Sequence, residues 1–410
     1  MIKIAQTYKD SFSGLSKEVW QLAAMMLVNR IGTLILPFLT LYTTQDLHWT
    51  AVNGGIAASA FGFGGLAGSY LGGVMTDRWG YYKTMTFGLF SAAIIFFFTQ
   101  YFTDFYYVCL ALFFGSLAAD TLRPALFSGL KYVTNKETQT RAISLMRMAF
   151  NLGIAIGPAA AGAFVIYTGY KSIFIIDAVT CLLAGVMLLL MIKNHESKAD
   201  AGGSNEIITG KSVVSPYKDG PFLLFMLSNL LMLIAFFQIV GTVPLFIKEG
   251  LNFTEREVGL FFTANGLIIF LFEMPLIRYI EQKGYSHLKI MIYGAFMMGA
   301  GLLCLVLPNL FLLPLILYTL LVSFGEIINF PFISTTSMDR ATDASRGKYM
   351  GLTSMMFSVA LIIAPLLGTS IYDAYGFDTL WVVMFLVNSV GLVGYYYSRK
   401  SLEASAEIAL

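Results

Sequence analysis

Apolar residues fill most of this chain in long blocks, which short polar segments separate. Twelve of the blocks are long enough to cross a lipid bilayer as an α-helix, which takes about 20 residues. Their approximate limits are 18–43, 51–75, 82–102, 105–130, 139–166, 171–192, 220–247, 256–279, 286–306, 310–335, 347–371 and 377–398. Backbone polar groups find no water in hydrocarbon, so such blocks form helices, and their continuous apolar character argues against barrel strands. The pattern predicts an all-α polytopic membrane protein with 12 transmembrane helices.

Landmarks of the first half recur in the second half at nearly one spacing. Five pairs lie 204 to 207 residues apart: Pro37 and Pro244, Gly80 and Gly284, Pro124 and Pro331, Arg141 and Arg346, and Pro158 and Pro365. Nearly one offset over a whole half indicates a repeat of six helices. The longest polar stretch, Lys193 to Asp219, is typical of a flexible linker. We predict an N-terminal six-helix half at 1–193, a cytoplasmic linker at 194–218 and a C-terminal six-helix half at 219–410.

Composition supports a membrane protein and excludes several function classes. Of the 410 residues, 57% are hydrophobic and 12% are charged, whereas soluble domains carry about 25% charged residues. The net charge of +2 gives no indication of nucleic-acid binding. The sequence has no Walker loop, and the apolar blocks hold no Ser-His-Asp set and no His-rich cluster. We therefore expect no ATP-driven step, no enzyme activity, no cofactor and no metal.

The placement of lysine and arginine predicts the orientation in the membrane. On one side of the membrane lie 20 of the 26 basic residues, and on the other side lie 3, namely Lys171, Lys248 and Arg256. Positive charge accumulates in cytoplasmic loops. We therefore expect both termini in the cytoplasm, in a multi-pass protein of the plasma membrane.

Two motifs carry a resemblance to a known family. Between the second and third blocks, Gly72 to Lys83 contains the pattern Gly-x-x-x-Asp-Arg-x-Gly-x-x-Lys. It resembles the loop between helices 2 and 3 of the major facilitator superfamily of secondary transporters, although Tyr81 and Tyr82 stand where basic residues are usual. In the fifth block, Asn151 to Gly162 resembles the Gly-x-x-x-Gly-Pro motif that this family links with exporters, particularly drug antiporters. The matching residues are Gly73, Asp77, Arg78, Gly80 and Lys83 in the first motif and Gly153, Gly157 and Pro158 in the second.

The resemblance implies a role for each motif. Asp77 would contact the N-terminus of helix 11, near Arg346, and form a cytoplasmic latch, because a helix N-terminus favours negative charge. The alternative is a loop that only fixes topology through its positive charge. The helix 5 motif would bend to open or seal a path, and the alternative is plain close packing of small residues.

Ionisable side chains at membrane depth are costly and are candidates for function. The first half has three cations and two acids inside its blocks, and the second half has two acids and no cation. These residues are Arg30, Asp120, Arg123, Arg147 and Asp177, and then Glu273 and Glu326. A central site between the halves would thus have one positive and one negative wall. The three histidines, His48, His195 and His287, are expected in loops and not at membrane depth, so a proton carrier would be a carboxyl group.

Each charged candidate has a competing structural explanation. Asp120 and Arg123 share a helix face and would form an internal ion pair, with Arg147 as a second partner. Alternatively, an arginine contacts an anionic substrate and is released when Asp120 takes a proton. Arg30 has no acid on its own helix and is expected to face a cavity. Glu326, among apolar side chains, is the expected proton carrier. Glu273 could instead pair with Arg278, and Asp177 is expected to reach the outer surface.

Together these features predict a secondary active transporter that works by alternating access. We expect it to be coupled to protons and to export drug-like amphipathic compounds. The alternative is a proton-coupled transporter of an anionic or zwitterionic metabolite, such as a peptide-like compound or an organic acid, because three arginines face acids across the halves. A channel is disfavoured by the repeat with its latch loop. The expected partners are the lipid bilayer, a small-molecule substrate and protons, with no nucleic acid and with a monomeric protein.

Overall fold

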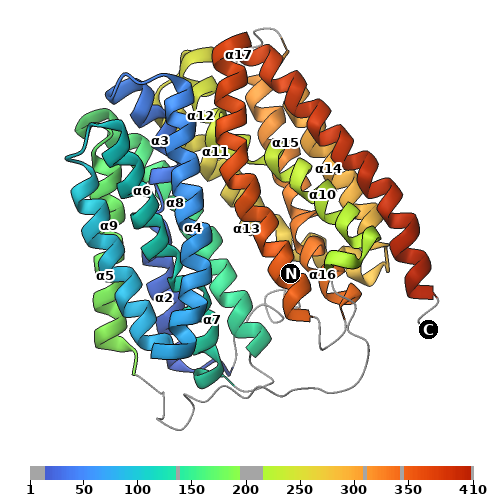
Figure 1. Cartoon of the computed structure of the whole chain (residues 1–410), viewed down its shortest axis with the longest axis horizontal. Coiled ribbons are helices and arrows are strands. Elements are labelled where there is room, and N and C mark those ends of the chain that lie inside the picture. Colours follow the sequence, from blue (N-terminus) through green and yellow to red (C-terminus); the bar gives the residue numbers. More distant parts are fainter. Residues whose placement is uncertain (1–13, 135–138, 194–215, 308–311, 342–345, 408–410) are drawn as a thin grey trace, which may run out of the picture. The chain divides into compact units, whose positions relative to one another are not determined.

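A computed structural model describes residues 14–134, 139–193, 216–307, 312–341 and 346–407. The described residues form helices and connecting turns, with no strand among them (Figure 1). In chain order the helices are α2 (Lys17–Ile31), α3 (Ile35–Leu41), η1 (Tyr42–Asp46), α4 (Ala51–Trp79), α5 (Tyr81–Thr99), α6 (Phe105–Asp120), α7 (Leu122–Val133), α8 (Gln139–Thr168), α9 (Ser172–Met191), η2 (Pro216–Lys218), α10 (Gly220–Phe236), α11 (Gln238–Gly241), α12 (Val243–Leu245), η3 (Phe246–Gly250), α13 (Glu255–Gln282), α14 (His287–Cys304), α15 (Leu313–Ile327), α16 (Phe330–Arg340) and α17 (Arg346–Glu407).

Within the described ranges, nine helical stretches are long and apolar enough to cross a membrane. The two other long helices are α4 and α13, and the stretch Tyr349–Arg399 of α17 covers two predicted blocks. α17 bends between these blocks at Gly376, whose φ of 80° is not helical. The predicted all-α polytopic fold is confirmed.

By its contacts the chain forms two compact units. Unit 1 comprises Met1–Ile35 and Phe63–Asn205, and unit 2 comprises Leu36–Gly62 and Glu206–Leu410. Most of the predicted linker, residues 194–215, lies outside the described residues. The segment Leu36–Gly62 belongs to the first half of the sequence but packs with unit 2, which the sequence pattern does not indicate.

Each unit has a helical core. In unit 1, α2 packs against α8 and α9, and α5 packs against α6 and α9. The buried side chains there include Leu22, Met26, Tyr81, Leu126 and Met146. In unit 2, α10 packs along α17, and α14 packs between α15 and α17. These helices are apolar on nearly all sides, as expected of helices covered partly by protein and partly by lipid.

The backbone repeats across the two halves at the offset that the sequence indicates. Both η1 and η3 are π-helical turns, and they begin 204 residues apart. Unusual positive φ angles recur in three pairs at offsets of 204 to 207: His48 and Asn252, Gly80 and Gly284, and Gly169 and Gly376. Only a repeated chain path places such rare conformations in register.

The first predicted block is not one continuous helix, as the sequence pattern suggested. α2 ends at Ile31, and α3 begins at Ile35. Gly32 lies in the break, where a side chain would overlap the hydroxyl of Thr180 on α9. The seventh block is broken in the same way, into α10, α11, α12 and η3. Broken helices occur in transporters beside binding sites, because their free backbone groups need polar partners.

Small residues join α4 to α17 in unit 2, and we call this contact the α4–α17 seam. A side chain on Gly55 would overlap Thr369 and lie 2.9 Å from the Pro365 carbonyl oxygen. The hydroxyl of Ser59 donates a hydrogen bond of 2.6 Å to the carbonyl of Ile362. Spacing of small residues at four-residue intervals lets two helices approach closely in a membrane.

At one end of the seam, three side chains form what we call the polar triad: Gln45, Glu249 and Tyr372. The amide of Gln45 donates to Oε1 of Glu249 at 2.8 Å. The hydroxyl of Tyr372 donates to Oε2 of the same carboxylate. The triad thus connects the two π-helical turns to α17.

At the opposite end of unit 2, Asp219 connects three helices. It caps α10 by accepting from the Phe222 N–H, and it is only 5% exposed. Nε and an Nη of Arg340 donate to its two oxygens at 2.8 and 3.1 Å. The hydroxyl of Tyr349 donates to it at 2.9 Å. We call this group the Asp219 cluster, and it joins α10 to α16 and α17.

Candidate functional site

Arg30 lies in the last turn of α2, directly before the break in that helix. Its Nε atom is buried and has no hydrogen-bond partner among the described residues. Its guanidinium carbon lies 4.6 Å from the centre of the Phe150 ring on α8. A cation over an aromatic face is attracted electrostatically, but the ring offers no acceptor lone pair. The Nε–H of Arg30 is therefore available inside unit 1 to donate a hydrogen bond to a further group.

Asp120 ends α6 and faces the same region as Arg30. Its carboxylate packs against Gly65 of α4, where any side chain would overlap it. Arg30 is its strongest charged neighbour, ahead of Arg123. No ion pair between Asp120 and Arg123 is recorded in the described ranges, so the predicted direct pair is not present. The structure thus places Arg30 and Asp120 together, although they come from helices 90 residues apart in sequence.

Arg123 and Arg147 are exposed on α7 and α8. Arg123 lies within electrostatic range of Arg30 and Asp120. The first-half site therefore consists of Arg30, Asp120 and Phe150, with Arg123 near its edge. Phe150 was not a sequence candidate, because an aromatic residue in an apolar block gives no signal of its own.

Asp177 does not reach the outer surface, and that prediction is wrong. It is 5% exposed and accepts hydrogen bonds from the backbone N–H groups of Leu34 at 3.0 Å and Ile35 at 3.4 Å. Leu34 directly precedes α3 and Ile35 is its first residue, where backbone N–H groups have no partner four residues earlier in a helix. The Leu34 N–H also donates to the carbonyl of Gly32 at 2.7 Å. Asp177 therefore holds the break in the first block.

Glu326 lies near the end of α15 in unit 2, and one of its oxygens, Oε2, is buried without a hydrogen-bond partner among the described residues. The Asn265 side chain interacts with it, and Asn265 also donates to the hydroxyl of Ser323 at 2.9 Å. The buried hydroxyl of Tyr318 also lacks a partner in the described part of the chain and lies within electrostatic range of Glu326. Glu273 on α13 is a second acid within that range.

This second-half site has acids and neutral polar groups only, among the residues described. Asn265 and Tyr318 were missed by the sequence reasoning, which considered ionisable groups only in these blocks. The amide of Asn265 inside an apolar helix was the available signal, because an isolated polar side chain at membrane depth requires a partner.

The helix 5 motif packs directly against the Arg30 region. A side chain on Gly153 would lie 2.5 Å from Cβ of Arg30, and one on Gly157 would overlap the carbonyl of Ile31. Pro158 follows inside α8 and is buried. Close packing is therefore a property of the motif, and the gating role stays a prediction.

The family is shown by a sequence model. The model described as Major Facilitator Superfamily matches residues 22–343 and, in a second match, residues 225–408. The chain belongs to the major facilitator superfamily.

Known members of the superfamily resemble this chain over most of its length. The uncharacterised MFS-type transporter YqjV of Bacillus subtilis (strain 168) is 21% identical over 380 residues, which cover 92% of this chain and 91% of that protein. Multidrug resistance protein 1 of the same organism is 22% identical over 335 residues, covering 80% of this chain and 83% of that protein. A crystal structure of a POT family transporter in complex with 5-aminolevulinic acid has a TM-score of 0.80 at 15% identity and covers 95% of this chain and 97% of that chain. This last likeness shows a shared fold.

The signature motif between helices 2 and 3 of this superfamily is mostly helical here. The sequence suggested a loop over residues 72–83, but α4 continues to Trp79 and α5 begins at Tyr81. Gly80 alone makes the turn, with φ of 86°, a conformation that other residues rarely adopt. Gly73 has open space around it, and Asp77, Arg78 and Lys83 are exposed. The latch with the N-terminus of α17 stays a prediction.

Proposed function

We propose that this superfamily member is a proton-coupled exporter of amphipathic, drug-like compounds, with both termini in the cytoplasm. The observation that carries the proposal is Glu326, whose buried Oε2 has no hydrogen-bond partner among the described residues. A buried charge needs a paired cation or must be neutralised. Since no ion pair with Glu326 is recorded in the described ranges, a proton or a cationic substrate is the neutralising partner. Exchange of one for the other is the chemistry of a proton antiporter.

Two further features support this function. Multidrug resistance protein 1 is a relative over four-fifths of this chain. The α4–α17 seam and the polar triad join the first-half segment Leu36–Gly62 to the rest of unit 2 through small side chains and a few hydrogen bonds. Such a contact can separate and re-form at low cost, as alternating access requires. Asp120, coupled electrostatically to Arg30, is the second proton-binding group in this proposal.

The second candidate is transport of an anionic or zwitterionic metabolite, and Arg30 favours it. Its buried Nε has an unused donor direction, and guanidinium groups bind carboxylates with good geometry. In this case Arg30 would bind the acidic group of the substrate.

Proton flux in proteoliposomes separates the two candidates. The vesicles carry a pH-sensitive dye and receive either lipophilic cations, such as tetraphenylphosphonium, or small zwitterions and organic anions. For an antiporter, cations drive counterflow of protons in the wild type, and Glu326→Gln abolishes the coupling while Asp120→Asn weakens it. Asp373→Asn, which changes an exposed acid in α17, is the matched control and retains the response.

Undiminished coupling in both Glu326→Gln and Asp120→Asn would remove these two residues from the proton path. A response to zwitterions or anions alone would favour the second candidate and make Arg30 a substrate-binding residue. No proton movement with either panel, from folded protein, would refute proton coupling itself.

A further inference from the structure

A cavity lies in unit 2 near the polar triad, at the end of the unit that we expect to be extracellular. Its volume is about 520 Å³, within the range of about 300–1,000 Å³ that small-molecule sites occupy. Its lining residues include Phe246, Leu251, Leu305, Pro314, Phe377 and Asp378. They come from η3, the turn after it, the ends of α14 and α15, and the bend of α17.

Aromatic rings form one wall of the cavity. The rings of Phe246 and Phe377 are 5.2 Å apart and nearly perpendicular. Phe377 also stacks on Tyr372 at 4.1 Å, and Phe246 lies edge-on to the buried Trp381 at 5.4 Å. Because each ring is held by others, the wall is preorganised and needs little ordering when a ligand binds.

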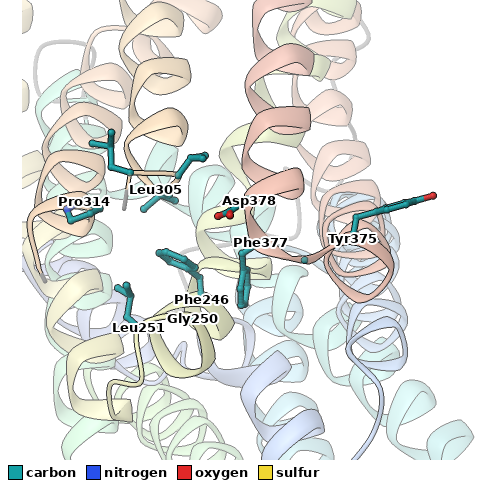
Figure 2. A pocket seen from close by; sticks show the side chains of 11 residues that line it. Phe246, Gly250, Leu251, Leu305, Pro314, Tyr375, Phe377 and Asp378 are labelled. Carbon is teal, nitrogen blue, oxygen red and sulfur yellow. The ribbon is translucent and has the colours of Figure 1, made fainter. Parts of the chain in front are cut away.

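A carboxylate faces the same space. Figure 2 shows the Asp378 carboxylate and the Phe246 ring bordering one opening, with Leu305 and Pro314 across from them, while Tyr375 points away. Asp378 is exposed, and no ion pair with it is recorded for the residues that the structure describes. A carboxylate attracts positive charge and disfavours an anion, and the aromatic rings beside it supply apolar contact area for an organic group.

We propose that this cavity is a second ligand site, which binds a monovalent organic cation with aromatic groups. It is separate from the Glu326 region, because Pro314 and Glu326 lie 12 residues apart on α15, or about 18 Å along the helix. Phe246 begins η3, and Tyr372 both stacks on Phe377 and donates to Glu249. A bound cation therefore contacts residues that support the polar triad.

Equilibrium binding to purified, full-length protein in nanodiscs tests the site. The probe is tetraphenylphosphonium, the neutral comparison compound is triphenylphosphine oxide, and the protein carries Glu326→Gln to remove the central carboxylate. In this background we expect saturable binding of the cation. Asp378→Asn weakens it about fivefold or more through loss of charge. Phe377→Leu weakens it by a similar factor through loss of aromatic contact area.

Two control variants guard against general disruption. Asp378→Glu keeps the charge and should retain cation binding, and Asp373→Asn removes an exposed acid nearby and should leave the affinity unchanged. Absence of saturable binding in the Glu326→Gln background overturns the proposal. Equal affinity in Asp378→Asn, or equal affinity for the neutral compound, also overturns it and indicates an apolar cavity for lipid. The assay measures binding alone, so it does not depend on proton coupling or on transport.

Discussion

At the scale of single residues, the first-half site is organised around a charge that is only partly neutralised. Arg30 has a ring on one side, Asp120 as its strongest charged neighbour and an unused Nε donor. Burying either charge alone is costly, and each lowers the cost of the other. The two residues should therefore behave as one energetic unit in the folded protein.

A double-mutant cycle measures that coupling. Arg30→Gln and Asp120→Asn should each lower the free energy of unfolding, because each leaves an opposite charge without its neighbour. The double variant should recover part of the loss, with a coupling energy of about 0.5–3 kcal/mol. The measurement is thermal unfolding in detergent. Arg147→Gln, which removes an exposed arginine outside the pair, is measured alongside as a comparison variant. Strictly additive losses would show that the two side chains do not interact.

The sequence identifies the charged residues of these sites but not their partners. Arg30, Asp120 and Glu326 stand out because ionisable groups in apolar blocks are rare. Asp177 also stands out, but its partners are two backbone N–H groups that become free only where another helix breaks. Since no side-chain pattern marks that break strongly, its role could not be inferred from sequence. Phe150 could not be inferred either, because the chain has many aromatic residues in apolar blocks and nothing in the sequence distinguishes this one.

At the scale of elements, helix ends determine how each unit is tied together. In unit 2, the Asp219 cluster holds the start of α10 against Arg340 at the end of α16 and against Tyr349 near the start of α17. Burial alone would raise the pKa of Asp219. Hydrogen bonds from Arg340 and Tyr349 outweigh burial, and the pKa lies below its ordinary value of 3.8.

The depressed pKa of Asp219 gives its stabilisation a definite pH dependence. A group with a lowered folded-state pKa stabilises fully above the unfolded pKa and loses that effect as pH falls through the folded value. Asp219→Asn should lower the free energy of unfolding at pH 7 by about 1–3 kcal/mol, since it removes charge-assisted hydrogen bonds. Unfolding measured from pH 7 down to pH 3 should show the difference between wild type and variant shrinking below pH 4. A difference that stays constant over this range would contradict the assignment, and Asp373→Asn serves as the control.

The elements themselves were only partly predictable. Within the described residues the predicted apolar blocks lie largely in helix, because length and hydropathy suffice for that prediction. The breaks after Ile31 and Phe236 were not predicted, although Gly32 and Thr33 follow the first break and Gln238 lies just after the second. The π-helical turns also have no common sequence: Tyr42 to Asp46 and Phe246 to Gly250 share no residue type in register. Packing against neighbouring helices sets these features.

At the scale of the whole molecule, the repeat was visible in the sequence, but the membership of Leu36–Gly62 was not. That segment packs in unit 2 through the α4–α17 seam, and no periodicity in the first half indicates a partner in the second. Helices with small residues at their contact approach each other closely, and few interdigitated side chains have to separate when the contact opens. We expect it to open and close during transport.

A bulky residue in the seam tests this expectation. Gly55→Trp should prevent closure, because even a methyl group there would overlap Thr369. Transport should fall at least about tenfold, while purified protein keeps its monodisperse elution and its helical content. Ile56→Trp, at the neighbouring position that is 37% exposed, is the matched control and should transport normally. Normal transport by Gly55→Trp would show that the seam does not have to close.

The hydrogen bond between Gln45 and Glu249 joins positions that are 204 residues apart, the same spacing that relates the two π-helical turns. Each residue therefore contacts its own counterpart in the other repeat. In an ancestral dimer of identical six-helix chains, such a contact would lie on the two-fold axis, and one residue would meet its own copy. Two carboxylates there would repel, whereas two amides could bond. In a single chain the two positions are independent, so one can be acidic while the other is an amide, and Gln45 with Glu249 is such an asymmetric contact, which a symmetric dimer could not hold.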